Sequence, residues 1–252
     1  MKKFELTTEF ITNAFGKKLF RIKALVEFGD VKAGELGGYV EKEGNVSQAG
    51  NAWVYGNARV SGDARVSGNA WVYGDARVSD NAWVYGNARV YGNAWVYGDA
   101  RVSGNAWVSG NARVYGDARV YGDARVSDNA WVYGNARVYG DARVYGDARV
   151  YGNAEVSGNA EVYGDARVSG DARVYGDADY ALVQGFGTEF RCTTFYRGKN
   201  KKIMVNCGCF HGDLEGFRKQ VKETRNGKIA KEYLMIADLM EYHFTSEDSS
   251  DE

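Results

Sequence analysis

The sequence has 252 residues, a formal net charge of −1 at pH 7, 14% aromatic residues and no proline. This length suits one or two domains, and the near-neutral charge argues against general electrostatic binding of nucleic acid. No apolar run approaches the roughly 18 residues that a membrane-spanning helix needs, and no hydrophobic run follows the basic start, so we expect neither a membrane span nor a signal peptide. Three cysteines, an odd number, suit a reducing cytoplasm.

Residues 1–50 are expected to form an N-terminal cap. Extended segments at 4–11 and 19–28 flank a turn at 13–16, which predicts a β-hairpin. In the second segment apolar side chains alternate with basic ones, so one face should be buried; the apolar residues are Phe20, Ile22 and Ala24. A repeat protein exposes unpaired backbone and an open core at its first coil, and such a hairpin would cover both.

The stretch from Asn51 to Gly176 consists of 21 consecutive six-residue units without insertion or deletion. Each unit reads Asn/Asp, Ala, variable, Val, Ser/Tyr, Gly/Asp. The Ala and the Val are two residues apart, so they point to one side of an extended segment and the variable residue points to the other. That variable residue is Arg in 13 units, Trp in six and Glu in two. A constant small and large apolar pair beneath a variable outer residue is typical of a solenoid wall.

This spacing resembles the hexapeptide repeat of left-handed parallel β-helices. The preceding stretch, Val31-Lys32-Ala33-Gly34 with Gly37-Gly38-Tyr39-Val40, resembles the start of YdcK-like hexapeptide-repeat proteins and of many phage and prophage proteins. The resemblance covers roughly residues 20–176. It implies a mainly β fold, a single-stranded left-handed parallel β-helix with three hexads per coil and about seven regular coils. It implies no settled activity.

An 18-residue coil would stack the variable residues of every third hexad in one of three columns. Tryptophans and glutamates are then expected to lie above or below arginines, and guanidinium stacking on indole is worth about 0.5–1 kcal/mol at an exposed site. One column with its neighbouring tyrosines is a candidate binding surface; its residues are Trp95, Arg113, Trp131, Arg149, Tyr115 and Tyr133. Arg, Trp and Tyr are enriched in protein-binding hot spots and also form stacking platforms for single strands. The alternative is that they only shield the rod from solvent.

The hexad pattern fades near residue 182, so we expect a β-helix at 51–182 and a C-terminal ββαα domain at 183–252. Two strands are predicted at 189–196 and 202–207. Asp213 is positioned to cap a helix whose apolar stripe is Leu214, Phe217 and Val221. A second helix from about Ile229 carries a further stripe, and an acidic tail follows at 247–252. This second stripe is predicted to mediate a twofold homodimer; its residues are Tyr233, Ile236, Met240 and Phe244.

The residues that carry metal or catalytic chemistry are sparse. Cys192, Cys207, Cys209 and His211 are a candidate zinc set if the strand stays extended through residue 211, and packed thiols are the favoured alternative. Hexapeptide β-helices are best known as acyltransferases that rely on a histidine, yet both histidines of this chain lie outside the repeats. We therefore expect no enzymatic activity and no cofactor.

The sequence thus predicts a non-enzymatic binding or scaffold protein, related to phage or prophage proteins. It is expected to engage a protein partner through its C-terminal domain or its Arg/Trp/Tyr surface. The resemblance to phage proteins implies that this partner belongs to a host system. Two alternatives stay open: nucleic-acid binding or mimicry by a charged rod, and a self-assembling filament.

Overall fold

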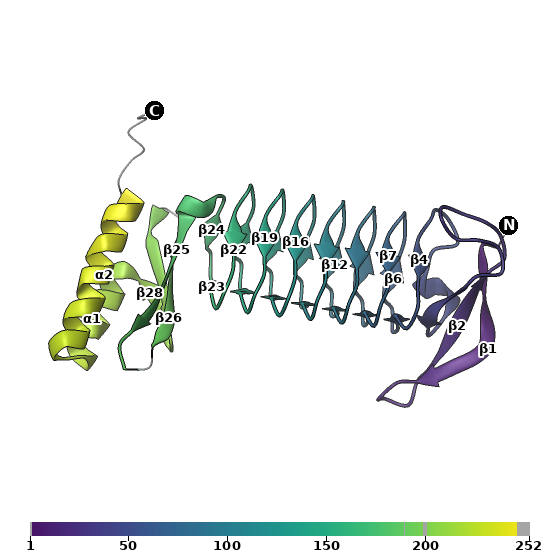
Figure 1. Cartoon of the computed structure of the whole chain (residues 1–252), viewed down its shortest axis with the longest axis horizontal. Coiled ribbons are helices and arrows are strands. Elements are labelled where there is room, and N and C mark those ends of the chain that lie inside the picture. The colour runs from purple at the N-terminus through teal and green to yellow at the C-terminus, as the bar shows by residue number, and fades with distance from the viewer. Residues whose placement is uncertain (1, 189, 199–200, 246–252) are drawn as a thin grey trace.

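The computed structural model describes residues 2–188, 190–198 and 201–245. The chain forms a long rod with a β-hairpin at its N-terminal end and a small sheet backed by two helices at its C-terminal end (Figure 1). The rod is a parallel β-solenoid whose wall consists of three seven-stranded stacks of two-residue strands. No helix in the described ranges is long and apolar enough to cross a membrane.

Each stack takes its strands from every third hexad, and we name each face after its first strand. The β4 face contains β4 (Trp53–Val54), β7 (Trp71–Val72), β10 (Arg89–Val90), β13 (Trp107–Val108), β16 (Arg125–Val126), β19 (Arg143–Val144) and β22 (Glu161–Val162). The β5 face contains β5 (Arg59–Val60), β8 (Arg77–Val78), β11 (Trp95–Val96), β14 (Arg113–Val114), β17 (Trp131–Val132), β20 (Arg149–Val150) and β23 (Arg167–Val168). The β6 face contains β6 (Arg65–Val66), β9 (Trp83–Val84), β12 (Arg101–Val102), β15 (Arg119–Val120), β18 (Arg137–Val138), β21 (Glu155–Val156) and β24 (Arg173–Val174).

The register confirms that residues eighteen apart are neighbours along the rod, as between Arg89 and Trp107. The predicted inward pair is also confirmed, because every Ala and Val of the hexads is at most 1% exposed. Val120 and Ala118 are buried at mid-rod, while Arg119 between them is exposed. The core is therefore a continuous column of alternating methyl and isopropyl groups.

The corners between faces depend on residues that adopt a positive φ angle. Glycine takes this position in most hexads, and Asp80 and Asp128 take it in two, with φ of 59° and 57°. Each of these carboxylates accepts a hydrogen bond from the amide of the residue eighteen positions later, as Asp80 does from Gly98 at 3.1 Å. This bond offsets the strain that a side chain meets in the left-handed region.

The N-terminal cap extends the β5 face beyond the first hexad. Strands β1 (Phe4–Thr12) and β2 (Lys18–Ala24) form the predicted hairpin, and β3 (Leu36–Val40) joins β2 to β5. Ile22 and Ala24 are buried as predicted, but Phe20 is only half-buried and Leu19 is buried in its place. The β1–β2 pairing shifts register between Phe20 and Ile22, and the β2–β3 pairing shifts between Arg21 and Lys23. These two shifts break the simple alternation of buried and exposed residues.

Trp53 corrects the expectation that every variable hexad residue points to solvent beside an arginine. It is 0% exposed and packs edge-on against Phe4 and Phe28 of the cap, and its strand neighbour is Trp71. The same packing explains the glycines of the Gly37-Gly38 motif. A Cβ on Gly37 would lie 2.6 Å from the Val54 carbonyl oxygen, and one on Gly38 would lie 2.6 Å from that of Ala58.

The backbone polarity of the rod determines what each end needs. Strand amides donate toward the C-terminal end, as Arg59 does to the Ala76 carbonyl, so the first coil presents free carbonyls. The buried Lys3 ammonium donates to the Ala52 carbonyl at 2.9 Å, and the Asn45 amide donates to the Ala64 carbonyl at 2.9 Å. Side-chain donors of the cap thus satisfy groups that no strand covers.

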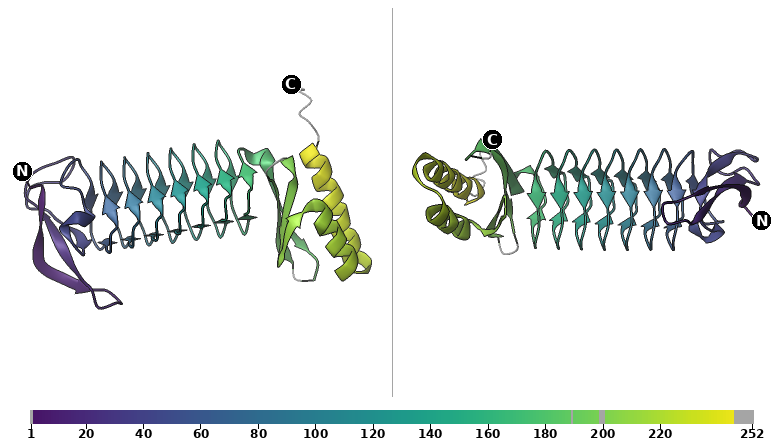
Figure 2. Two further views of the ribbon diagram at one scale, coloured as in Figure 1. Left: turned by 180° about the vertical axis from the view of Figure 1, so that it is seen from behind. Right: turned by 90° about the horizontal axis from the view of Figure 1, so that it is seen from below.

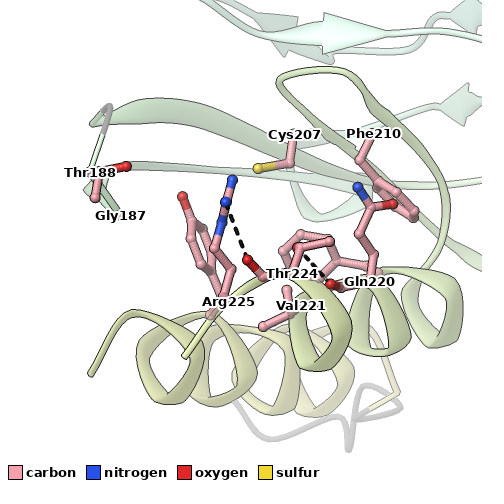
Figure 3. Close-up of a pocket in the computed structure, with 10 residues that line it drawn as sticks. Gly187, Thr188, Cys207, Phe210, Gln220, Val221, Thr224 and Arg225 are labelled. Atoms are coloured by element: carbon pink, nitrogen blue, oxygen red, sulfur yellow. Dashed lines mark hydrogen bonds between the residues drawn. The ribbon is translucent and has the colours of Figure 1, made fainter. Parts of the chain in front are cut away.

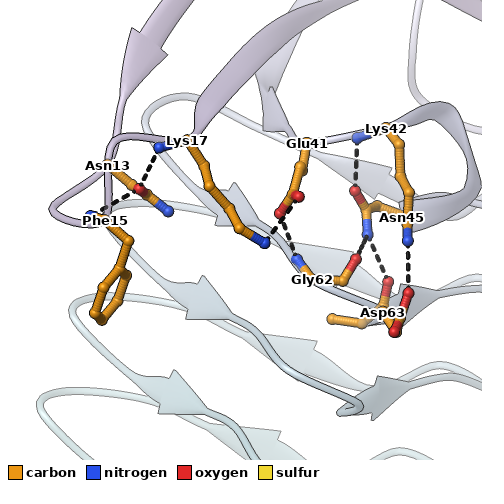
Figure 4. A network of polar contacts seen from close by, with 9 residues as sticks. Asn13, Phe15, Lys17, Glu41, Lys42, Asn45, Gly62 and Asp63 are labelled. Atoms are coloured by element: carbon orange, nitrogen blue, oxygen red, sulfur yellow. Dashed lines mark hydrogen bonds and ion pairs between the residues drawn. The ribbon is translucent and has the colours of Figure 1, made fainter.

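A second polar network ties the hairpin turn to the first corner of the rod (Figure 4). Asn13 accepts from the amides of Phe15 and Lys17, and the Lys17 ammonium pairs with Glu41 at 3.1 Å. Glu41 in turn accepts from the Gly62 amide at 2.7 Å. This backbone bond, followed by the Lys17 pair, holds the pKa of the Glu41 carboxyl below its usual value.

The C-terminal unit contains four antiparallel strands where two were expected. They are β25 (Tyr180–Phe186), β26 (Arg191–Arg197), β27 (Ile203–Cys207) and β28 (Phe210–Asp213). The 3-10 turn η2 (Asp177–Asp179) links them to the rod, and a similar turn, η1 (Glu43–Asn45), lies in the N-terminal cap. The sheet stands between the rod and the helices (Figures 1 and 2). The Tyr196 ring belongs to the core of the rod, so this sheet is its second cap.

Two helices cover the outer face of the sheet, α1 (Leu214–Thr224) and α2 (Gly227–Thr245). Asp213 caps α1 as predicted, because its carboxylate accepts from the Gly216 amide at 2.9 Å. The predicted stripe of Leu214, Phe217 and Val221 is buried against the sheet. The acidic tail predicted at 247–252 lies outside the described residues.

Candidate functional site

The six residues proposed as a binding surface lie together on the β5 face. Trp95, Arg113, Trp131 and Arg149 occupy the outward positions of consecutive strands β11, β14, β17 and β20. Tyr115 and Tyr133 lie beside them in a second column, where their ring centroids are 4.9 Å apart and the angle between the ring planes is 0°. The 18-residue period therefore builds one continuous surface from residues of four consecutive coils.

Arginines and tryptophans alternate along this face as a stacked column. The guanidinium of Arg113 lies 5.4 Å from the centroid of Trp95 and 5.0 Å from that of Trp131. Arg149 covers the other side of Trp131 at 4.9 Å. Such contacts stabilise the column by about 0.5–1 kcal/mol each and fix the rotamers of long side chains.

The tyrosine column is longer than the two residues selected from sequence. Tyr97 stacks on Tyr115 at 4.9 Å, and Tyr151 stacks on Tyr133 at 5.0 Å. Both were missed, although the fifth hexad position read at a period of eighteen places Tyr97, Tyr115, Tyr133 and Tyr151 in one uninterrupted run. Burial first, and neighbouring phenols second, raise the pKa of Tyr115 and Tyr133, so both hydroxyls stay protonated donors at neutral pH.

This geometry changes what the surface offers to a ligand. The ring faces of Tyr115 and Tyr133 are covered by the tyrosines above and below, and those of Trp131 are covered by guanidinium groups. These side chains are partly exposed, so they offer a ligand ring edges, phenol hydroxyls and guanidinium groups instead. A stacking platform for bases needs free ring faces, so the middle of this face does not have that form.

Charge separates the β5 face from its neighbours. Arg137 pairs with Glu155 at 3.4 Å on the β6 face, and Arg143 pairs with Glu161 at 3.0 Å on the β4 face. On the β5 face, no carboxylate of the described residues forms an ion pair with any of the outward arginines, which are Arg59, Arg77, Arg113, Arg149 and Arg167. The outward column of this face therefore carries arginines that are not paired with carboxylates, whereas the aspartates of its hexads lie at the corners.

The candidate zinc set is not assembled. In the β26–β27 pair Thr193, and not Cys192, lies opposite Cys207, so the two cysteines point to opposite faces of the sheet. The chain also turns sharply after Cys207, because Cys207 pairs with Phe210 and leaves Cys209 exposed in the turn. His211 pairs with Asn206 on the rod side. No group of three potential metal ligands occurs in the part of the chain that the structure describes.

The Cys207 thiol accepts a hydrogen bond from the Thr193 hydroxyl at 3.1 Å. It faces a small pocket between the sheet and the two helices (Figure 3). Phe210, Gln220 and Tyr233 also line this pocket, whose volume is about 60 Å³. A water molecule takes about 30 Å³ of liquid volume, so this pocket is too small for an organic ligand and is a packing gap. Burial raises the pKa of the Cys192 thiol on the other side of the sheet.

The residues predicted for self-association have another role. Tyr233, Ile236, Met240 and Phe244 are 3–8% exposed and form the core between α2 and the sheet. They cannot present a dimer surface, because the two added strands supply the apolar face that they cover. The outward side of α2 is also apolar, and it exposes Met235, Leu239 and Tyr242.

Comparison with known families identifies the repeat. The YdcK Beta solenoid repeat model matches eleven segments, of which the first ten overlap and the last stands apart; they are residues 52–68, 58–74, 70–86, 82–98, 94–110, 106–122, 118–134, 130–146, 136–152, 142–158 and 166–178. A comparison with curated proteins finds no match.

Proposed function

We propose that this chain, which belongs to the YdcK β-solenoid repeat family, is a non-enzymatic binding or scaffold protein that engages a protein partner through the β5 face. The observation that carries the proposal is the pair of unbroken columns on that face, Trp95 to Arg149 and Tyr97 to Tyr151. Tyr, Trp and Arg dominate the energetics of protein interfaces.

Order within the columns supports this function. A flexible Arg or Tyr side chain loses conformational entropy when a partner immobilises it. Here the rings are stacked within 4° of parallel and each guanidinium lies against an indole, so most of that entropy is lost on folding. A preorganised surface of this kind binds with a smaller entropic cost.

The exposed chemistry favours a protein with acidic side chains over a single-stranded nucleic acid. Hydroxyl and guanidinium donors face outward, while the ring faces that bases would need are occupied. The filament alternative is disfavoured because a cap covers each end of the rod. The three free cysteines suit a reducing compartment, and the resemblance to phage proteins favours a host protein as target.

Affinity capture with matched variants tests the proposal. Tyr115→Ser with Tyr133→Ser removes the centre of the tyrosine column, and Tyr73→Ser with Tyr91→Ser removes the equivalent stacked pair on the β4 face. Serine is native at this hexad position, so both variants should fold. We expect a protein captured from host extract by the parent and by the β4-face variant to be depleted at least fivefold with the β5-face variant. Equal capture by both variants would refute the role of this face.

A further inference from the structure

The β6 face contains a groove whose chemistry differs from that of the β5 face. Its lining residues are Tyr85, Arg101, Ser103, Arg119, Tyr121 and Arg137, and its volume is about 240 Å³. These residues come from strands β9, β12, β15 and β18 and the turns that follow them, so the regular register of the rod holds them in place.

Arg119 is placed unlike every other outward arginine. Its neighbours in the adjacent strands are Arg101 on one side and Arg137 on the other, so neither an indole nor a carboxylate lies next to it in the column. Each other arginine of the three faces has a Trp, a Glu, Tyr39 or the end of its stack on at least one side. Like charges directly opposite in a sheet repel, and a bound anion would relieve that repulsion.

Charges near the groove leave it positive. Arg137 pairs with Glu155 at 3.4 Å, which offsets part of its charge. Asp99 and Asp117 lie at the corner two positions before Arg101 and Arg119, and within the described ranges neither forms an ion pair with an arginine. Arg101 and Arg119 are therefore available to an external anion.

The tyrosine column of this face has a gap of one residue at Ser103. Tyr85 precedes the gap, and Tyr121 follows it with its far side stacked on Tyr139 at 4.9 Å. The ring of Tyr85 is nearly perpendicular to that of Trp83, at 85°, as the ring of Tyr97 is to that of Trp95, at 77°. Since Tyr97 belongs to a parallel stack, Tyr85 has the ring orientation that a stack needs.

The gap has the width of one planar ring. Two strand spacings separate Tyr85 from Tyr121, roughly 9.6 Å, so a ring between them would lie about 4.8 Å from each. This is the spacing at which the tyrosines of the rod stack on one another. The β6 face has a second Tyr-Ser-Tyr gap, at Ser157. Ser157 is only 4% exposed and lies beside Glu155, so this gap is closed and acidic.

We propose that this groove binds a nucleotide, with the base stacked between Tyr85 and Tyr121 and its phosphates on Arg101, Arg119 and Arg137. Stacking of a base on aromatic rings together with a row of guanidinium groups is the chemistry that recognises such a ligand. The site lies on a different face from the proposed protein-binding surface, so either function can fail without the other. A free nucleotide and a nucleotide within a single strand share this chemistry.

Calorimetric titration with ATP, tripolyphosphate and adenosine tests the proposal on the full chain. Ser103→Tyr fills the gap and converts residues 99–104 into the hexad found at 117–122, so it should fold. Arg119→Gln removes the central charge. Ser109→Tyr makes the same substitution on the β4 face, converts residues 105–110 into the hexad found at 93–98, and serves as control.

We expect the parent and Ser109→Tyr to bind ATP equally, and adenosine to bind at least tenfold more weakly than ATP. Ser103→Tyr should lose ATP binding at least tenfold and keep that of tripolyphosphate, whereas Arg119→Gln should weaken both. A short single-stranded oligonucleotide that binds more tightly than ATP and is displaced by it would identify a strand as the source. Absence of ATP binding at millimolar concentration, or unchanged binding by Ser103→Tyr, would overturn the proposal.

Discussion

The side-chain amide of Asn206 donates a 2.7 Å hydrogen bond to the backbone carbonyl of Arg167, across the junction between the C-terminal sheet and the last coil. The Thr194 hydroxyl accepts from the Arg167 amide at 3.0 Å, so the two side chains satisfy both polar groups of one strand residue. Buried backbone groups without partners cost about 1–3 kcal/mol each. Side chains therefore complete the rod where strand pairing stops.

Asn206→Leu should loosen the C-terminal cap without unfolding the rod. The variant removes the donor to Arg167 and to Ser169, so we expect a loss of about 1–3 kcal/mol that is confined to the last coils. Hydrogen exchange should accelerate in β23 and β24 and stay at the parent rate in β10 to β13. Uniform acceleration along the rod would show that the cap stabilises all coils together.

The columns of the rod could be predicted from the uninterrupted hexads together with the three hexads per coil that the family resemblance implies, because residues eighteen apart then meet. Trp95 and Arg113 are predicted neighbours on this basis, and the structure pairs them. Trp53 obeys the same hexad rule yet is buried, because the hairpin that covers it packs from distant positions. The sharp turn after Cys207 was missed since that segment reads as extended. For α2, apolar residues occur on two sides, and the sequence pattern does not determine which side meets the sheet.

Val120→Asp should unfold the middle of the rod. The Val120 side chain is 0% exposed, and burying an unpaired carboxylate there is expected to cost at least about 3 kcal/mol. Arg125→Asp changes an exposed outward residue in the next hexad and should cost only about 0.5 kcal/mol. Urea denaturation of both variants checks the contrast, and similar midpoints would contradict the inward assignment.

Lys3 should give the rod a pH dependence in the alkaline range. Burial lowers the pKa of its ammonium to about 8, against roughly 10.4 in the unfolded chain. Between these values the unfolded chain binds more protons, so the free energy of unfolding contributed by Lys3 rises as pH increases from 8 to 10. The gap in urea midpoint between the parent and Lys3→Gln should change across this window and stay constant between pH 6 and 7. A constant gap throughout would mean that Lys3 is charged in the folded state over the whole range.

Self-association stays a prediction, and the structure moves it to the outward side of α2. An antiparallel pair of α2 helices would bury Met235, Leu239 and Tyr242 of both copies and bring the basic first half, with Lys231, near the acidic second half, with Asp238. Opposed helix dipoles favour the same arrangement. Leu239→Lys should convert a dimer to a monomer in light scattering, while Glu223→Lys on α1 should leave it unchanged. A monomeric parent chain in light scattering would contradict the predicted self-association.

The affinity of the captured protein for variants of the β5 face tests the central claim most directly. Arg113→Glu reverses a charge within the stacked column, and Arg125→Glu makes the same change on the β4 face, where Arg125 stacks on Trp107 at 5.0 Å. The account predicts that Arg113→Glu raises the dissociation constant at least tenfold, about 1.4 kcal/mol, and that Arg125→Glu leaves it within twofold of the parent value. Equal effects of the two reversals, or none from Arg113→Glu, would contradict the assignment of this face as the binding surface.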